Sequence, residues 1–389
     1  MDKFTEEKGY NKKYLIVINV LLLLILSGTS CFLFYRQFNT DGESYFSDLI
    51  PHVKAALDDG AYTLIYSLYR FVWKIYPSGI SIAFLLTVIV VLTVMAVAVF
   101  ISKIVGGGID GHVILAVGLV FLSCLYIPVL YPYFYVRGVI VTQPWHNCTY
   151  LIMRLMGLLV LAQYFTMRKN YLNHISLRDM VIFTVLLIFV NYAKPNFIIA
   201  FAPAMLIFLI ADFIKYKWEK VWQIVAFGTC VLLSCLLLLH SLHLYFPKEG
   251  DSGVTITMEV FQEFVVSKEF FPRLIAGLLF PLIVLVFAIL LKEKNDMMIH
   301  AWVMYAIAWW ERTFIMETGP RKMYGNFGWG ILFFAFFLFM ISISQWILWY
   351  KEDKISKRTY CCGMVVLALH VICGFVYYGY LLAGYFYLI

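Results

Sequence analysis

Residues 79–102 read GISIAFLLTVIVVLTVMAVAVFIS and contain no charged side chain. A helix needs roughly 20 apolar residues to cross the hydrocarbon core of a bilayer, so this segment is long enough to span a membrane. The rest of the chain is similar, because 63% of its 389 residues are apolar and only 14% are charged. Those few charges could not cover the surface of a soluble protein. The composition excludes a soluble enzyme, a disordered chain and a secreted disulfide scaffold, and predicts an all-α polytopic integral membrane protein.

Apolar runs bounded by charged residues predict about eleven transmembrane helices. They cover residues 14–35, 79–102, 113–131, 148–167, 179–193, 196–213, 221–246, 272–291, 297–312, 328–350 and 360–388. No repeat of fixed period interrupts this order. Residues 1–389 are therefore predicted to form a single transmembrane domain that contacts membrane lipids.

The lysines and arginines predict the orientation, because short cytoplasmic loops of membrane proteins are rich in both. Every second loop carries at least one of them when the N-terminus, with Lys3, Lys8, Lys12 and Lys13, lies in the cytoplasm. The first apolar run lacks a small-residue cleavage site and is expected to remain uncleaved. This placement explains the net charge of +7 without nucleic acid as a partner. A bacterial plasma membrane fits the Lys-rich and Ile/Phe-rich composition.

Two extracytoplasmic loops are of notable size, at residues 36–78 and 247–272. In the first loop, residues 45–57 and 61–76 place their apolar side chains at helical spacing. Such segments are typical of amphipathic helices that lie along a membrane surface. The second loop is expected to form either a third surface helix or a mobile flap.

The first loop also carries the candidate catalytic residues. Asp48 and His52 are four residues apart and share a face of the predicted helix 45–57, with Lys54 nearby. A carboxylate at a membrane surface can act as a general base on an acceptor hydroxyl. Asp41, which precedes the helix, is the second candidate for this base. The structural alternative for Asp48 is a helix cap or a solvated surface charge.

Other polar, charged and aromatic side chains gather at the outer ends of the predicted spans. Ionisable groups beside hydrocarbon are costly and usually face a polar cavity, although long cationic side chains also reach back to the interface. We predict a cationic pocket for a phosphate-bearing substrate, in which Trp and His would contact a sugar. Besides His52 and Lys54, its members would be Trp145, His146, Asn147, Arg154, Lys194, Glu311, Arg312, Arg321 and Lys322.

Metal binding has little support in the sequence. Asp41-Gly42-Glu43 could hold a divalent cation, but two carboxylates at this spacing are common by chance. The eight cysteines show no zinc-binding spacing and mostly fall in apolar runs. No metal ligand and no certain cofactor are therefore predicted.

The layout resembles the GT-C superfamily of membrane glycosyltransferases. The resemblance consists of a first span, an acidic residue at Asp41 or Asp48, two surface helices and a second span. It implies that Asp48, or otherwise Asp41, is the catalytic base, and that Arg321 and Lys322 hold a lipid phosphate. It further implies a polyprenyl-phosphate-linked sugar as donor. The D-E-x-x-Y type loop motif of better-known members and a large soluble C-terminal domain are both missing from the sequence.

The sequence therefore favours a glycosyltransferase that moves a sugar from a polyprenyl-phosphate carrier to a glycan, lipid or protein acceptor outside the cytoplasm. A transporter or flippase of lipid-linked saccharides is the first alternative, although the polar residues cluster at the outer rim and not at the midplane. A polysaccharide polymerase or ligase is the second. A non-catalytic assembly partner is the third, and it would not need the acidic first loop.

Overall fold

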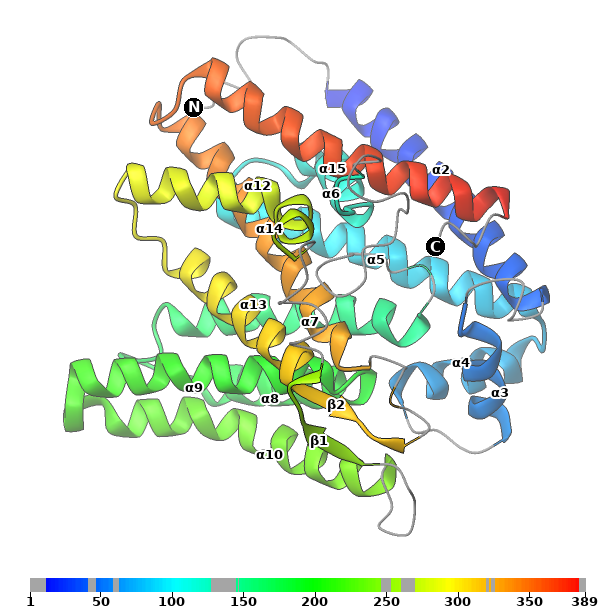
Figure 1. Cartoon of the computed structure of the whole chain (residues 1–389), viewed down its shortest axis with the longest axis horizontal. Helices are drawn as coiled ribbons and strands as arrows, with labels where there is room; N and C mark the ends of the chain where they lie inside the picture. Colours follow the sequence, from blue (N-terminus) through cyan, green and yellow to red (C-terminus); the bar gives the residue numbers. More distant parts are fainter. Residues whose placement is uncertain are drawn as a thin grey trace.

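The computed structural model describes residues 12–40, 47–58, 63–126, 145, 147–245, 253–259, 270–319, 322 and 326–384. Almost all of this part is helical (Figure 1). The longer helices are α2 (Lys12–Asn39), α5 (Gly79–Val105), α7 (Cys148–Arg168), α8 (Leu177–Ala193), α9 (Asn196–Tyr216), α10 (Val221–Tyr245), α12 (Phe270–Leu290), α13 (Asp296–Phe314), α14 (Trp329–Lys351) and α15 (Lys357–Ala383). The shorter elements are α3 (Leu49–Asp58), α4 (Leu64–Ile75), α6 (Val113–Val120), three 3₁₀ turns (Ile109–His112, Lys217–Lys220 and Asn326–Gly328), β1 (Val254–Ile256) and β2 (Ile315–Glu317).

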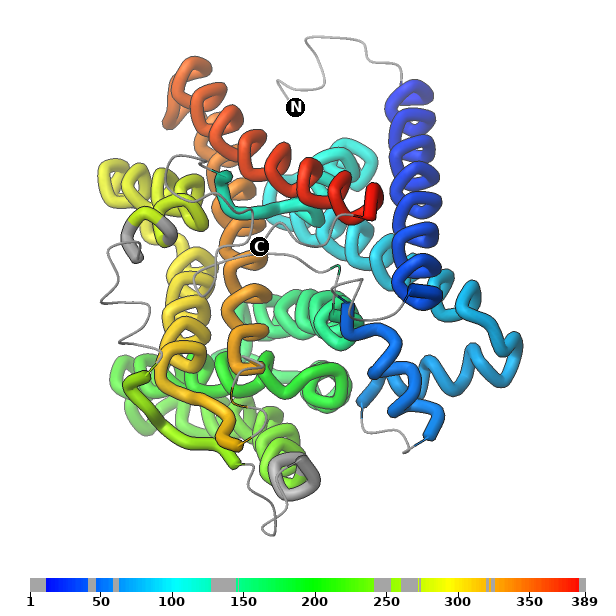
Figure 2. The backbone as a smooth tube through the Cα atoms, turned by 45° about the vertical axis from the view of Figure 1, so that its right-hand side comes forward, coloured from blue at the N-terminus to red at the C-terminus, as the bar shows by residue number. Residues whose placement is uncertain are grey.

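The chain is an all-α membrane protein, because six helical segments of the described residues are long and apolar enough to cross a bilayer. One of the six is the continuous stretch of α9, its 3₁₀ turn and α10. Helix α14 is almost fully enclosed by its neighbours, whereas α2 lies at the edge of the molecule and exposes Leu21, Leu24 and Ile25 (Figure 2). Exposed aliphatic side chains on a long helix are suited to contact with lipid.

One end of the molecule, here named the basic end, holds the turns that follow α5, α7, α9, α12 and α14 (Figure 1). Arg168 joins three helices there, with its guanidinium 2.9 Å from Asp212 and 3.2 Å from Asp296. Lys354 and Glu293 pair at 2.5 Å and join two of the turns. The predicted cytoplasmic loops therefore lie together at one end.

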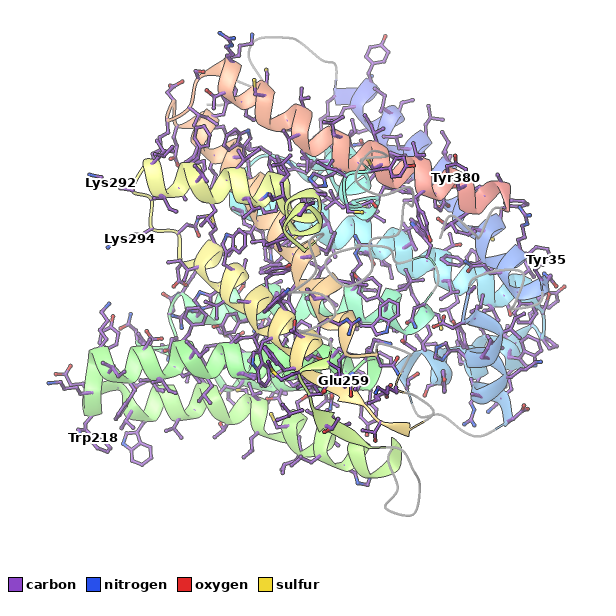
Figure 3. All side chains as sticks on the ribbon, in the orientation of Figure 1. Tyr35, Trp218, Glu259, Lys292, Lys294 and Tyr380 are labelled. Atoms are coloured by element: carbon purple, nitrogen blue, oxygen red, sulfur yellow. The ribbon has the colours of Figure 1, made fainter. Side chains whose placement is uncertain are left out.

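Figure 3 shows Trp218, Lys292 and Lys294 at the basic end and Tyr35 and Tyr380 at the opposite end. The opposite end is named the site end below. Helices α3 and α4 lie there, close to the end of α2 and the beginning of α5 (Figure 2).

The two helices predicted in the first loop are confirmed, with α3 beginning at Leu49 and α4 at Leu64. The Thr63 side chain caps α4 by accepting from the backbone N–H of Tyr66. The Arg70 side chain donates to the carbonyl of Ala56 at 2.5 Å and joins the two helices. Each helix buries one face, with Leu49 and Val53 buried on α3 and Ile65 and Tyr69 on α4, whereas the apolar Phe71 and Ile75 of α4 are exposed.

The third predicted span, residues 113–131, is wrong for residues 121–126, because α6 ends at Val120. The following backbone runs between α15 and α12 without helical structure. There the N–H of Ser123 donates to His370 at 3.3 Å, and that of Leu125 donates to Ala276 at 2.9 Å. Eight helical residues are too few to cross a bilayer. Tertiary hydrogen bonds thus replace the helical ones that the apolar run would otherwise form.

The second large loop contains a short strand that the sequence did not predict. β1 pairs antiparallel with β2, with Val254 opposite Glu317 and Ile256 opposite Ile315. Strand β2 directly follows α13. The pairing fixes Glu317 beside the beginning of α14.

Candidate functional site

Asp48 lies directly before α3 and at the centre of a polar cluster at the site end. Its Oδ2 is 3.3 Å from Nε2 of His52, one helical turn later, and it also accepts a hydrogen bond from the amide of Asn147. The Asp48 side chain is 34% exposed and that of His52 is 24% exposed. The carboxylate is therefore held in a fixed position on a partly exposed side chain, with its Oδ1 buried.

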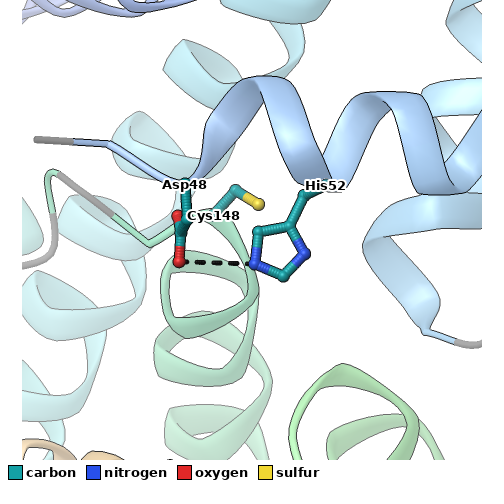
Figure 4. Close-up of side chains that lie close together, drawn as sticks. All are labelled: Asp48, His52 and Cys148. Atoms are coloured by element: carbon teal, nitrogen blue, oxygen red, sulfur yellow. Dashed lines mark ion pairs between the residues drawn. The ribbon is translucent and has the colours of Figure 1, made fainter. Parts of the chain in front are cut away.

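The beginning of α7 supplies the other half of the cluster (Figure 4). Asn147 is the N-cap of α7, and its Oδ1 accepts from the backbone N–H of Tyr150 at 2.9 Å. Since the amide oxygen is used in capping, the amide nitrogen is directed to Asp48. The Sγ of Cys148, the next residue, lies within 4.8 Å of the ligand atoms of Asp48 and His52.

Helix α4 contributes two tyrosines, Tyr66 and Tyr69, next to this cluster. The Tyr66 hydroxyl is 2.6 Å from Nδ1 of His52, so both ring nitrogens of the histidine have polar neighbours. Tyr69, one turn further, is fully buried near Cys148. Burial raises the pKa of Tyr69 well above its ordinary value, so its hydroxyl stays neutral.

Lys194 connects to the same cluster from the turn between α8 and α9. Its ammonium donates to the Thr149 hydroxyl at 2.7 Å, and that hydroxyl donates to Oδ1 of Asn147 at 2.6 Å. The ammonium also lies 4.8 Å from the centre of the Trp329 ring. Burial lowers the pKa of Lys194 to about 8, against the opposing effect of Asp48. A cation that is partly removed from water interacts strongly with a nearby anion.

A second polar network begins two residues after Lys194. The Asn196 amide donates to Oε1 of Glu311 at 3.1 Å and to the carbonyl of Asn326 at 2.9 Å. The Asn326 amide in turn donates to Oε2 of Glu317 at 2.7 Å. The carboxyl groups of Glu311 and Glu317, from α13 and β2, are thus fixed next to the Lys194 turn.

Several sequence-predicted site residues converge in these two networks. Asp48, His52, Asn147 and Lys194 lie in the first network, and Glu311 lies in the second. Arg312, the neighbour of Glu311, packs its side chain on Gly328, 3.1 Å from the position that a Cβ there would occupy.

Two predicted substrate contacts belong to the protein core. The Trp145 ring is buried, with its centre 4.5 Å from that of Tyr378. Arg154 is only 1% exposed and donates to the carbonyls of Leu119 and Val120 at 3.2 and 3.4 Å. Its guanidinium caps the C-terminus of α6, where backbone carbonyls lack helical partners.

Two predicted cations lie on the surface. Lys54 is exposed on α3, two residues from His52 and therefore on a different face. Lys322 is exposed and pairs with Glu259 at 2.7 Å. Asp41, His146 and Arg321, also predicted for the site, lie outside the described residues, as does Glu43 of the tripeptide considered for a metal.

Three residues of the site, Cys148, Thr149 and Tyr66, were not predicted from the sequence. Asn147-Cys148-Thr149 matches a glycosylation sequon, yet the side chains of Asn147 and Thr149 are engaged in the site network. The position of the Cys148 thiol, between two hydrogen-bonding residues at the start of an apolar run, was the one sequence feature that could have indicated its role. No sequence feature indicated a role for Tyr66, because tyrosines are frequent throughout this chain.

No protein-family model and no curated protein matches this chain in sequence comparisons.

Proposed function

We propose that this protein is a membrane glycosyltransferase of the GT-C type, which moves a sugar from a polyprenyl-phosphate carrier to an acceptor hydroxyl. One observation carries the proposal. The carboxylate of Asp48, on a side chain that is one-third exposed, is held by Asn147 and His52 at the beginning of a loop helix, and hydrogen bonds through Thr149 and Asn147 link it to the Lys194 ammonium. A base and a cation in one site are what such a transfer requires.

In the proposed reaction Asp48 accepts the proton of the acceptor hydroxyl. The hydroxyl oxygen forms a bond to the anomeric carbon, and the bond from that carbon to the phosphate oxygen breaks. Polyprenyl phosphate leaves with the electron pair of the broken bond. Asn147 and His52 hold the carboxylate in position for this step.

The charge that develops on the phosphate needs a cation nearby. Lys194 is the best-placed candidate, because its ammonium is partly buried and interacts with Asp48. Lys322, which the family resemblance assigned to the phosphate, already pairs with Glu259. An exposed pair of this kind is weak and exchanges readily, so Lys322 would guide the donor towards the site and Lys194 would stabilise the leaving group.

The proposed orientation follows from the separation of the two ends. The basic end would face the cytoplasm by the positive-inside rule, with the N-terminus on the same side. The site end would then face the outside of a bacterial plasma membrane, with α3 and α4 along the membrane surface. In this arrangement about eleven helices belong to the membrane domain, and α6 enters it only partly.

Native mass spectrometry of the purified protein tests the donor pocket. We expect the wild type to retain a polyprenyl phosphate or its sugar conjugate, and Lys194→Gln to lose it. Lys74→Gln is the matched control, because Lys74 is exposed on α4 and takes no part in the networks described above. Bulk phospholipid alone in all three proteins would overturn the proposal.

A further inference from the structure

We propose that Asp48, His52 and Cys148 form a zinc site with three protein ligands and one open position. Figure 4 shows the three side chains directed towards one another, two from the α3 segment and one from the beginning of α7. The carboxylate oxygen, the ring nitrogen and the sulfur all lie within 4.8 Å of one another. Among the described residues this is the one group of at least three such side chains with that spacing.

The distances suit tetrahedral coordination. Zinc binds nitrogen and oxygen ligands at about 2.0 Å and sulfur at about 2.3 Å. Two ligands at about 2.0 Å in a tetrahedron are about 3.3 Å apart. The Asp48 and His52 ligand atoms are separated by 3.3 Å. These two residues can therefore share one ion without a change in their positions.

The side chains that hydrogen-bond to the proposed ligands resemble the outer partners of ligands in known metal sites. The Tyr66 hydroxyl contacts Nδ1 of His52 at 2.6 Å, which leaves Nε2 directed at Asp48 and Cys148. When Nδ1 carries the proton and donates it to Tyr66, the Nε2 lone pair is free for the metal. The Asn147 amide orients the Asp48 carboxylate by donating to Oδ2, the same oxygen that lies 3.3 Å from Nε2 of His52. Such outer partners orient the ligands and raise metal affinity.

The donor set selects the kind of metal. A thiolate with an imidazole and a carboxylate suits zinc, whereas Mg²⁺ and Ca²⁺ prefer oxygen ligands. A deprotonated Cys148 and Asp48 would together neutralise a divalent ion. Zinc with one open position lowers the pKa of a bound water or alcohol. The open position would face the accessible side of Asp48, because Cys148 is buried.

This inference shares Asp48 with the proposed function, where a zinc-bound Asp48 would hold the metal instead of acting as the free base, but it does not rest on sugar transfer. Metal binding can be measured directly, so a failure of either proposal leaves the other testable. Cobalt replaces zinc in sites of this kind and reports its ligands by absorption. A thiolate ligand gives a charge-transfer band in the near ultraviolet, and tetrahedral geometry gives intense visible bands.

The experiment uses the full chain, stripped of metal and titrated with Co²⁺ and then with Zn²⁺. The background carries Cys361→Ser and Cys362→Ser, since these two adjacent cysteines are exposed and would bind metal adventitiously. We expect one Co²⁺ per chain, with a thiolate band that Zn²⁺ abolishes. Cys148→Ser should lose the band, and His52→Ala should lose binding. His174→Ala should leave both the thiolate band and metal binding intact, because His174 is exposed and does not belong to this cluster.

A milder variant keeps the test valid if a ligand variant fails to fold. Tyr66→Phe removes only the hydroxyl behind His52, and a change at such a position weakens metal binding by about 10- to 100-fold. Tyr76→Phe is its control, because Tyr76 is exposed at the end of α4. Unchanged affinity in Tyr66→Phe, or a thiolate band that persists in Cys148→Ser, would overturn the zinc site.

Discussion

The amide of Asn147 donates a hydrogen bond to the carboxylate of Asp48, and the two residues are 99 positions apart in the sequence. Each precedes a helix, Asp48 at α3 and Asn147 at α7. The bond therefore joins the loop helices to the helical bundle through the candidate base itself. Loss of this contact would affect both the position of α3 and the chemistry of Asp48.

Asp48→Asn tests the base directly. The amide has nearly the same shape but cannot accept the proton, so we expect transfer to fall by about 10²- to 10⁴-fold. Transfer from a polyprenyl-phosphate sugar is the measurement, and Asp58→Asn, at the exposed end of α3, is the control. Full activity in Asp48→Asn together with its loss in Asp41→Asn would assign the base to Asp41. Activity in both variants would contradict the mechanism.

The lowered pKa of Lys194 leads us to expect that donor binding depends on pH. Its pKa is lowered to about 8 by burial, so the cation is present below pH 8 and is lost as the pH rises through that value. We expect kcat/KM to decline above about pH 8, two units below the range of an ordinary lysine. Lys194→Arg should remove this decline, because arginine stays protonated.

The control for that profile is Lys74→Arg, which changes an exposed lysine of α4. It should leave the profile as in the wild type. A decline that persists at the same pH in Lys194→Arg would show that another group titrates.

A substitution at Gly374 is expected to have a large effect on stability. A Cβ at this position of α15 would collide with the backbone carbonyl of Phe121, which cannot move aside as a flexible side chain can. We expect Gly374→Ala to lower the free energy of unfolding by about 3 kcal/mol, the upper end of the usual cost of overpacking. Gly379→Ala, on the same helix with open space around it, should be neutral or stabilise by up to about 1 kcal/mol.

Thermal unfolding in detergent measures both glycine variants. Equal midpoints for the two would contradict the path of residues 121–126 between α12 and α15.

The orientation of the two ends can be tested by cysteine labelling in intact cells. In a background without Cys361 and Cys362, an impermeant maleimide should label Asp58→Cys at the site end. It should label Lys294→Cys at the basic end only after the membrane is opened. The reverse pattern would place the site in the cytoplasm and contradict an extracytoplasmic acceptor.

The positions of the helices could be predicted from the sequence because they depend on local patterns. An uncharged run such as residues 79–102 satisfies its backbone only as a helix in a bilayer, and α5 occupies Gly79–Val105. The run at 113–131 was equally apolar, but α6 ends at Val120 because the backbone beyond it bonds to α12 and α15. Those partners follow more than a hundred residues later in the sequence.

The candidate site was predictable only in part for the same reason. The spacing of Asp48 and His52 within one helix was sufficient to place them on one face. By itself the sequence determined a membrane-embedded helical chain with acidic residues in its first loop and basic residues in alternate turns. Only the tertiary structure brought Cys148 and Lys194 to Asp48 and assigned Arg154 and Trp145 to the core. Local periodicity specifies a helix, whereas contacts between distant helices depend on how their side chains pack together.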